Sequence, residues 1–351
     1  EMSASLVGSE MCIRDRDIAA EVGVSISTVS RVLNTDNPSA ARPELQRKIW
    51  EVAKQQGYCP NPIARRLKDK SSIITPEVQY INCIYGCIPQ ETKDDPFYLQ
   101  LLKSVEQEAF RHDYHVSCAY TATPGDSFFE SPLLSNVPSD LLIILGRFKP
   151  ELLNKLKPTY KKIVNICLNV LDVDCDQIIC SGRKMLFSSV EYLHSLNHEK
   201  IGFIGNHEQR YLGYHDGILT FGLPDDPRYV VDDIIISMEG GYLGALRLLE
   251  RAPEITAICC ANDIIAIGAL RACNEKGLRV PEDISIIGVN DIENTQYTNP
   301  MLTTVRVPLK EMGQTAVTVL LDRVNGGHSS YIKVEFPFQI VKRGSCRALN
   351  P

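Results

Sequence analysis

The feature that most constrains this chain is a regular alternation of short apolar runs with amphipathic stretches, which extends through residues 73–351. Near-continuous apolar runs of this length are typical of strands buried on both faces, and the intervening stretches have helical spacing. Strands that alternate with helices predict parallel sheets covered by helices. The eight strands expected here fit two doubly wound subdomains better than one sheet.

The expected elements of this α/β region follow from the apolar pattern. The expected strands are residues 81–85, 116–120, 141–145, 163–168, 201–204, 234–236, 257–260 and 284–289. The expected helices are residues 97–111, 183–196, 241–251, 264–276 and 309–324. None of the apolar runs approaches the roughly 18 residues that cross a bilayer, so we expect no integral membrane protein.

Several classes of function are disfavoured by what the sequence lacks. The twelve cysteines are scattered through apolar stretches without zinc spacing, which indicates reduced thiols in a cytoplasmic protein. Gly202-x-x-Gly205 lacks the third glycine of a dinucleotide motif, and phosphate-loop, HExxH and GxSxG motifs are absent. The seven histidines show no metal-ligand spacing. We therefore expect no enzyme, metal or cofactor.

The charge of the chain is unevenly distributed. The net charge is -6, but residues 12–72 carry eleven lysines and arginines against seven aspartates and glutamates. Residues 73–351 carry a net charge of -8. A small basic module ahead of a large acidic body suggests that only the first part contacts nucleic acid.

Residues 17–34 (DIAAEVGVSISTVSRVLN) predict two short helices around a tight turn at Gly23, with Ser25 as N-cap of the second helix. The apolar residues expected to face inward are Ile18, Ala19, Val22, Val29, Val32 and Leu33. The residues expected to face outward are Ile26, Ser27, Ser30 and Arg31. This is the pattern of a helix-turn-helix, in which Arg31 can bond guanine and Ile26 can contact a thymine methyl.

A third amphipathic helix is expected after Pro43, with Leu45, Ile49, Val52 and Ala53 on its apolar face. Farther along, Asn61 as N-cap and Pro62 predict another helix of about seven residues, which needs a partner to form. Its basic residues favour DNA phosphates, and Leu67 suits a minor-groove wedge. From the spacing alone, a solvated linker is slightly favoured.

Residues 17–34, followed by Y-x-P-N-x-x-A-R-R-L at 58–67, resemble the LacI/GalR family of bacterial regulators. The resemblance implies that Ser27, Thr28, Ser30 and Arg31 face the operator and that Asn61, Ala64 and Leu67 belong to a hinge helix. With Ile26 and Asn34, these are the expected DNA-binding residues. The resemblance implies a helix-turn-helix domain at 17–58, a hinge helix at 59–72 that orders on DNA, and an effector-binding and dimerisation domain at 73–351. It also implies a homodimer on a pseudo-palindromic operator.

Residues 1–16 depart from the family pattern. Arg14 stands where the family usually has the threonine that caps the first helix, and residues 5–16 resemble a translated sequencing adapter. We expect this stretch to be an artefact in place of the native start, or a short disordered tail.

Polar side chains follow the ends of several expected strands, where ligands bind in folds of this kind. They are Asn169, Arg210, Asn262, Asn290 and Asp291, with Asn206 and Asp263 nearby. Amide, carboxylate and guanidinium groups can bond neighbouring hydroxyls, which suits a sugar. The alternative for each asparagine or aspartate is a helix N-cap, which is at least as good an interpretation for Asp263.

Residues 261–272, 277–288 and 300–305 also resemble the family's periplasmic-binding-protein-like effector domain. The resemblance implies that Arg210, Asn262, Asn290 and Asp291 hold the effector, although the family often has aspartate at position 290. The aromatic residue that commonly stacks on a sugar falls near Ile236.

Residues 202–205 and 289–292, with the spacing after Asn34, resemble the branch that contains the evolved-β-galactosidase repressor, which implies galactose or a galactoside. The expected protein is a repressor of a sugar-utilisation operon that the effector releases from DNA. The alternatives are a non-sugar or corepressor ligand, and a sugar-binding protein without DNA function.

The predicted role of Arg31 in base recognition can be tested by Arg31→Ala. Loss of a bidentate bond to guanine should cost about 1–3 kcal/mol on the operator and relax specificity at one base pair. Fluorescence anisotropy on operator variants and on random DNA measures both effects. An equal loss on random DNA would contradict base recognition.

Overall fold

The computed structural model describes residues 17–34, 41–55, 79–86, 95–119 and 139–349. The chain divides into two compact units, residues 1–81 with 105–117 and residues 82–104 with 118–351. The predicted hinge helix, with Asn61, Ala64 and Leu67, lies outside the described residues, and so does the N-terminal stretch 1–16. No helix in the described ranges is long and apolar enough to cross a membrane.

Three helices form the expected small core in the first unit. They span residues 17–22, α2 (Ile26–Asn34) and α3 (Pro43–Gln55). Their buried residues are Ile18, Ala19, Val22, Val29, Val32, Leu33, Ile49, Val52 and Ala53. The inward faces predicted from helical spacing are therefore confirmed.

The turn between the first two helices also has its predicted chemistry. Gly23 has a φ of 78°, and the amides of Gly23 and Val24 both donate to the Ala19 carbonyl at 3.0 Å. Ser25 Oγ accepts a hydrogen bond from the Thr28 amide at 3.1 Å, as an N-cap does. The turn and cap together set the direction in which α2 leaves the first helix.

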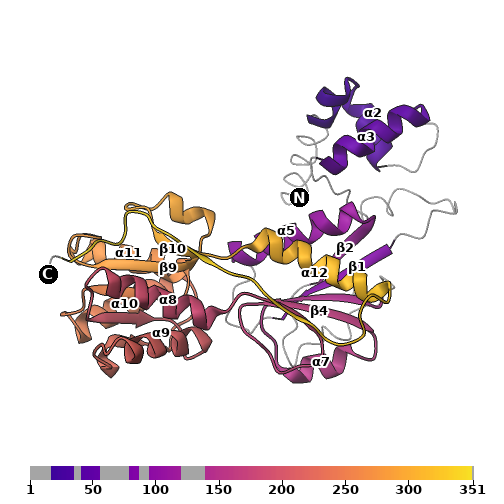
Figure 1. The fold of residues 1–351 in the computed structure, drawn as a ribbon. Helices are drawn as coiled ribbons and strands as arrows, with labels where there is room; N and C mark the ends of the chain where they lie inside the picture. The colour runs from indigo at the N-terminus through magenta and orange to yellow at the C-terminus, as the bar shows by residue number, and fades with distance from the viewer. Residues whose placement is uncertain (1–16, 35–40, 56–78, 87–94, 120–138, 350–351) are drawn as a thin grey trace. The chain divides into compact units, whose positions relative to one another are not determined.

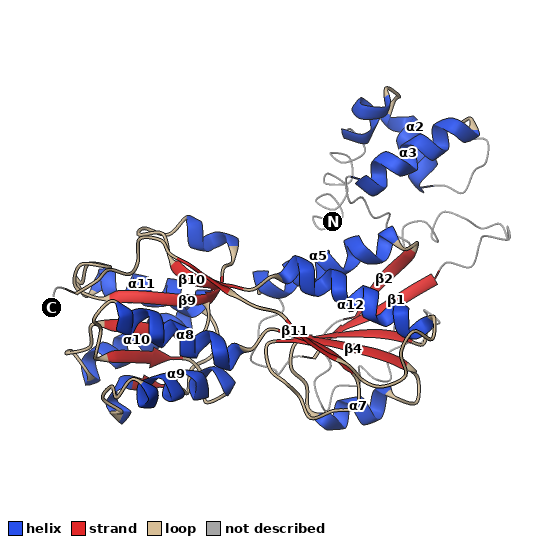
Figure 2. Ribbon diagram, in the orientation of Figure 1, coloured by secondary structure: helices blue, strands red, loops and turns tan. Residues whose placement is uncertain are grey.

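Two six-stranded sheets form the rest of the fold (Figure 2). The first, in the order β11-β5-β4-β3-β1-β2, is built from β1 (Gln79–Tyr85), β2 (Tyr114–Ala119), β3 (Leu141–Leu145), β4 (Lys162–Cys167), β5 (Asp176–Ile179) and β11 (Lys333–Glu335). The second, in the order β12-β10-β9-β8-β6-β7, is built from β6 (Ile201–Ile204), β7 (Val230–Val231), β8 (Ala257–Cys260), β9 (Ser285–Asn290), β10 (Thr303–Arg306) and β12 (Gln339–Val341). We call these sheets, with their helices, the first and second subdomains.

Parallel pairing runs from β1 through β3, β4 and β5 to β11 in the first sheet. It runs from β7 through β6, β8 and β9 to β10 in the second, whereas β12 is antiparallel to β10. The central strands β3, β8 and β9 are buried along their whole length, as the apolar runs predicted.

Helices cover both sheets, and the chain passes between the subdomains three times. The first sheet has α5 (Pro96–Arg111), α7 (Pro150–Leu156) and α12 (Leu309–Val324), and Figure 1 shows α7 and α12 on opposite sides of it. The second has α8 (Gly182–Ser195), α9 (Gln209–Thr220), α10 (Met238–Arg251) and α11 (Asp263–Glu275). Crossovers follow β5, β10 and β11.

Most expected elements are present, but the strand expected at residues 234–236 is wrong. The strand in this region is β7, which pairs with β6, and pairing ends in an isolated bridge between Asn206 and Asp233. Ile234 and Ile236 are buried without belonging to a strand, because Ser237 immediately caps α10. The pattern also missed β5, β10, β11, β12, α7 and α9, which are short or rich in polar residues.

Glycines allow α10 and α11 to approach backbone to backbone. A Cβ on Gly268 would lie 2.0 Å from the Met238 carbonyl oxygen, and one on Gly241 would lie 2.3 Å from that of Ile265. No side chain fits at either position. This close packing fixes the start of α11, which follows directly on Asn262.

A buried ion pair joins β5 to α12. Asp176 is fully buried, and its carboxylate receives two hydrogen bonds from Arg323 at 2.7 and 2.8 Å. The Ile332 amide and His328 Nε2 lie 2.9 and 3.2 Å from the same carboxylate. The pair therefore fastens α12 and the segment before β11 to the first sheet.

The stability of the first subdomain should depend on this pair. We expect Arg323→Ala to lower the free energy of unfolding by about 3–5 kcal/mol, because it leaves the Asp176 charge buried without its partner. Arg279→Ala, which removes an exposed pair with Asp283, should leave stability unchanged within error. Urea unfolding of the two variants makes the comparison, and equal losses would contradict the assigned importance of Asp176.

Candidate effector cleft and DNA-recognition helix

A cleft is lined by residues from both subdomains. Its walls come mainly from segments just after β3, β4, β6 and β8 and from the end of β9. The lining residues are Asp95, Phe97, Tyr98, Leu101, Gly146, Arg147, Ile166, Cys167, Leu168, Asn169, Asn206, Glu208, Arg210, Ile236, Ala261, Asn262, Asn290 and Met312. The carboxyl ends of parallel strands thus meet where the fold predicts a ligand.

Four asparagines line this cleft, each from a different strand end. Asn169, Asn206 and Asn262 follow β4, β6 and β8, and Asn290 is the last residue of β9. An amide side chain both donates and accepts hydrogen bonds. The wall is therefore suited to groups that do the same, such as hydroxyls.

Arg210 and Asn262 are held in place by the backbone of the second subdomain. Arg210 Nη1 donates to the Ala261 carbonyl at 2.8 Å, and Nη2 lies 3.3 Å from Asn290 Oδ1. Asn262 Oδ1 accepts from the Ile265 amide at 3.0 Å and caps α11. The alternative interpretation of these residues as helix N-caps is therefore correct for Asn262. Its side-chain oxygen is used by the cap, so a ligand would meet its amide nitrogen.

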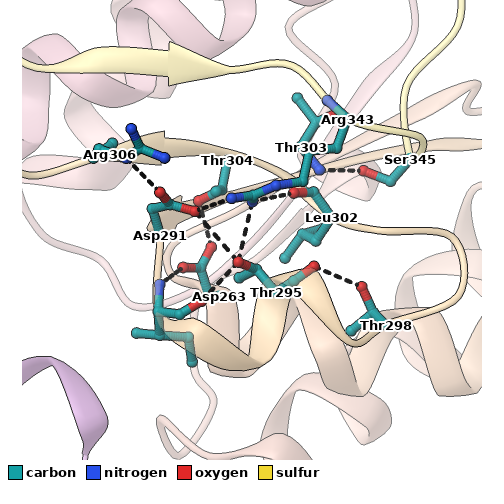
Figure 3. Close-up of polar contacts among 11 residues, drawn as sticks. Asp263, Asp291, Thr295, Thr298, Leu302, Thr303, Thr304, Arg306, Arg343 and Ser345 are labelled. Carbon is teal, nitrogen blue, oxygen red and sulfur yellow. Dashed lines mark hydrogen bonds and ion pairs between the residues drawn. The ribbon is translucent and has the colours of Figure 1, made fainter.

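Asp291 is placed differently from the other predicted effector residues, because it does not line the cleft. Its Oδ1 lies 2.6 Å from Arg343 Nη2, and its Oδ2 lies 2.6 Å from Arg306 Nε. Figure 3 shows the carboxylate between the two guanidinium groups. Both oxygens are already occupied, so we leave Asp291 out of the proposed effector set.

Sequence reasoning missed two features of the cleft. Arg147, after β3, forms an ion pair with Glu208, after β6, so that the pair links the two subdomains. Phe97 and Tyr98 form an aromatic part of the wall at the start of α5, away from Ile236, where the family's aromatic residue falls. The strand-end rule could have flagged Arg147 and Glu208, but only the tertiary structure pairs them.

Cys167 lies in the cleft wall but is chemically unreactive. Burial raises the pKa of its thiol to about 12, and Sγ donates a hydrogen bond to the Asn169 carbonyl. The thiol is therefore neutral near pH 7 and a poor nucleophile. In the part of the chain that the structure describes, no group of three His, Cys, Asp or Glu side chains is placed to hold a metal ion.

The outward face of α2 carries the expected small polar and apolar side chains. Ile26 is 41% exposed, Ser27 is exposed and Thr28 is half-buried. Ser25 Oγ lies 2.8 Å from both Ser27 Oγ and Thr28 Oγ1, which orders the start of the helix. The side chains of Ser30, Arg31 and Asn34 lie outside the described residues.

Comparison with known proteins agrees with this arrangement. Residues 16–61 match the model of bacterial regulatory proteins of the lacI family, and residues 190–346 match a periplasmic binding protein-like domain. The HTH-type transcriptional repressor CytR of Escherichia coli K12 is 29% identical over 352 residues, covering 95% of this chain and 96% of CytR. The chain belongs to the lacI family of bacterial regulators.

Solved structures support the same fold for this lacI-family regulator. A lac repressor dimer bound to operator and an anti-inducer has a TM-score of 0.66 at 24% identity, covering 95% of this chain and 98% of that one. A LacI family regulator from Enterococcus faecium with bound ribose has a TM-score of 0.67 at 23% identity, covering 78% and 100%. Two parallel-sheet subdomains and a helix-turn-helix are thus the family's architecture.

Asp263, the first residue of α11, is fully buried behind the cleft wall of this regulator. Its carboxylate accepts hydrogen bonds from Thr304 Oγ1 at 2.5 Å and the Ile292 amide at 2.9 Å. A Cβ on Gly288 would lie 2.3 Å from Asp263 Oδ1, so only glycine leaves room there. Burial raises the pKa of this carboxyl to about 7, although both hydrogen bonds favour its charged form.

The raised pKa of Asp263 predicts a pH-dependent loss of stability. The stability that the Asp263 carboxyl contributes is fully present below about pH 4 and is lost as pH rises through about 7. Within this range, each pH unit lowers the free energy of unfolding by up to about 1.4 kcal/mol. Asp263→Asn removes this dependence. Urea unfolding of both proteins from pH 4 to 8 should show that the stability of the variant, relative to that of the parent, increases with pH.

The matched control for this prediction is Asp283→Asn. The Arg279 guanidinium holds the pKa of Asp283 well below its usual range, so the stability that Asp283 contributes is lost only under stronger acid. Its difference from the parent should be flat between pH 4 and 8. Parallel stability curves for Asp263→Asn and its parent would show that the buried carboxyl does not titrate as stated.

Proposed function

We propose that this lacI-family regulator is a homodimeric cytoplasmic repressor that binds operator DNA through α2 and that a small effector in the cleft controls this binding. The observation that carries the proposal is the coexistence of a helix-turn-helix with exposed Ile26 and Ser27 and a cleft lined by strand ends of both subdomains. One face can meet a major groove, and the other site is concave and polar enough for a small molecule.

The chemistry of the cleft favours an uncharged effector rich in hydroxyl groups. The four asparagines and Arg210 supply hydrogen-bonding groups. The side-chain oxygens of Asn262 and Asn290 are bonded within the protein, which leaves their amide nitrogens as donors. The charge of Arg147 is balanced by Glu208. Position 290 adds no charge either, since it holds asparagine where the family often has aspartate. A neutral sugar satisfies these groups.

The aromatic wall refines this effector class. Phe97 and Tyr98 lie at the start of α5. The angle between their ring planes is 88°, and their ring centroids are 5.1 Å apart. An aromatic face covers the apolar face of a sugar ring or of a nucleoside base. Within the sugars we propose galactose or a galactoside, on the resemblance of residues 202–205 and 289–292. The relative with bound ribose supports a sugar of some kind.

The proposed mechanism is a linkage between two states of the effector domain. An effector that contacts both subdomains favours the arrangement in which the cleft is closed around it. If this arrangement disorders the hinge helices at 59–72, operator affinity falls. By reciprocity, the effector must then bind the DNA-free protein more tightly, by the same factor.

The proposal is tested by fluorescence anisotropy on DNA from upstream of the protein's own gene, at fixed salt. The panel includes galactose, galactosides, ribose, cellobiose and nucleosides. Sequence-specific binding that one compound releases would support the repressor and identify the effector. Tightening of the complex by a compound would instead indicate corepression. Failure to bind specific DNA, also after residues 1–16 are replaced by a family-like start, would contradict the proposal.

The effector site itself is tested by Arg210→Met. Loss of a charged hydrogen-bond donor should weaken binding of the effector by about 10- to 100-fold, because such bonds contribute about 1.5–3 kcal/mol. Operator affinity without effector should be unchanged. Calorimetric titration gives the effector affinity, with Arg247→Met as control, since Arg247 pairs with Asp233 on the surface. An unaltered affinity in Arg210→Met would place the effector elsewhere.

A further inference from the structure

The turn that follows β9 has an unusual backbone conformation. Asn290 has a φ of 119° and Asp291 a φ of 56°, so two consecutive residues other than glycine lie at positive φ. Such conformations cost free energy and persist where the surroundings hold them, often at ligand sites. Asn290 lines the cleft, whereas the carboxylate of the next residue is bound outside it.

The partners of Asp291 form a compact charged cluster (Figure 3). Its side chain is 5% exposed and is bound by Arg306 and Arg343, each at 2.6 Å. Arg343 also donates to the Leu302 carbonyl at 2.8 Å and to Thr295 Oγ1 at 3.1 Å. Charged hydrogen bonds of this length in a buried place are strong and directional.

These partners lie next to the segments that pass between the subdomains. Arg306 is the last residue of β10, and the chain goes from there directly to α12 on the first subdomain. Arg343 follows β12, which the chain enters after its third crossover. The Asp291 carboxylate therefore joins the cleft-lining turn to the start of one crossover and to the strand after another.

We propose that Asp291 and Arg306 are a positioning pair that transmits effector occupancy at Asn290 to the crossover between β10 and α12. The proposal rests on the proposed function, because it assigns the route by which the cleft changes the angle between the subdomains. Asn290 and Asp291 share a peptide bond, so a ligand that moves one moves the other. The ion pair obliges Arg306 to follow.

Asp263 determines how the turn can move. Its carboxylate binds the Ile292 amide at 2.9 Å, which holds the far end of the turn against α11. Displacement of Asn290 is then taken up at Asp291, between the cleft and Ile292. Coupling of this kind needs a contiguous set of contacts that has two arrangements. Half of the Arg306 side chain is exposed, so this side chain has room for a second arrangement.

The experiment compares Arg306→Gln and Asp291→Asn with the parent protein. The coupling factor is the ratio of operator Kd values with and without saturating effector, and we expect both variants to lower it by about fivefold or more. Effector affinity on DNA-free protein should stay within about twofold. Arg306→Lys, which keeps the charge, should retain the coupling. Arg279→Gln, an exposed arginine elsewhere on the second subdomain, should behave as the parent.

Two results would overturn the proposal. One is an unchanged coupling factor in both Arg306→Gln and Asp291→Asn. The other is a large loss of effector affinity on DNA-free Asp291→Asn, which would make Asp291 a direct effector contact.

Hydrogen exchange of the effector-free protein separates this proposal from the proposed function. Arg306→Gln should speed exchange both in residues 306–309 and in the turn at 290–292. Exchange that changes only in residues 306–309 would contradict the link, even if no operator or effector is ever found. Absence of operator and effector binding in the parent would count against the proposed function alone.

Discussion

The constraint on which the rest of this structure depends is the parallel pairing of its strands. Because neighbouring strands point the same way, each βα connection returns the chain to the same edge of the sheet, and all carboxyl ends meet there. The fold has two such sheets, and strand ends from both line a single cleft. Four asparagines and an arginine from distant parts of the sequence thus come together without long loops.

The two subdomains are individually rigid and jointly connected by few elements. Within each, buried groups such as the Asp176–Arg323 pair and the backbone contacts of Gly268 leave little freedom. Between them run three crossovers, with the Arg147–Glu208 pair across the cleft. We therefore expect the least costly motion to be a change of angle between the subdomains, as the proposed mechanism requires.

Two buried carboxylates lie behind the cleft wall. Asp263 and Asp291 lie within one cluster at the start of α11 and the end of β9, and each is bound by several donors. The cleft lining has four asparagines, the Arg147–Glu208 pair and one further residue of each charge, Arg210 and Asp95. The charged cluster behind the wall holds the strained turn that carries Asn290.

Sequence patterns sufficed for the elements whose residues have a strong period. The α2 cap at Ser25, the core faces of the first three helices, α12 and the central strands β3, β6 and β8 follow from local spacing. Short strands such as β5 and β10 could not be predicted, because their buried Asp176, Gln177, Thr303 and Thr304 look like loop residues until their partners are known. The strand wrongly predicted at 234–236 is the opposite case. Burial there comes from packing against other elements, and these residues do not pair with a strand.

The sequence by itself determined the fold class, the helix-turn-helix and the family, because these depend on periodicity and on residues that are neighbours along the chain. The strand-end rule also placed Asn169, Arg210, Asn262 and Asn290 at the carboxyl ends of strands. Only the tertiary structure decided that Asp291 is bound by Arg306 and Arg343, that Glu208 pairs with Arg147, and that Phe97 and Tyr98 supply the aromatic wall. Those partners are far apart in sequence, and no local pattern records which charges meet once the chain has folded.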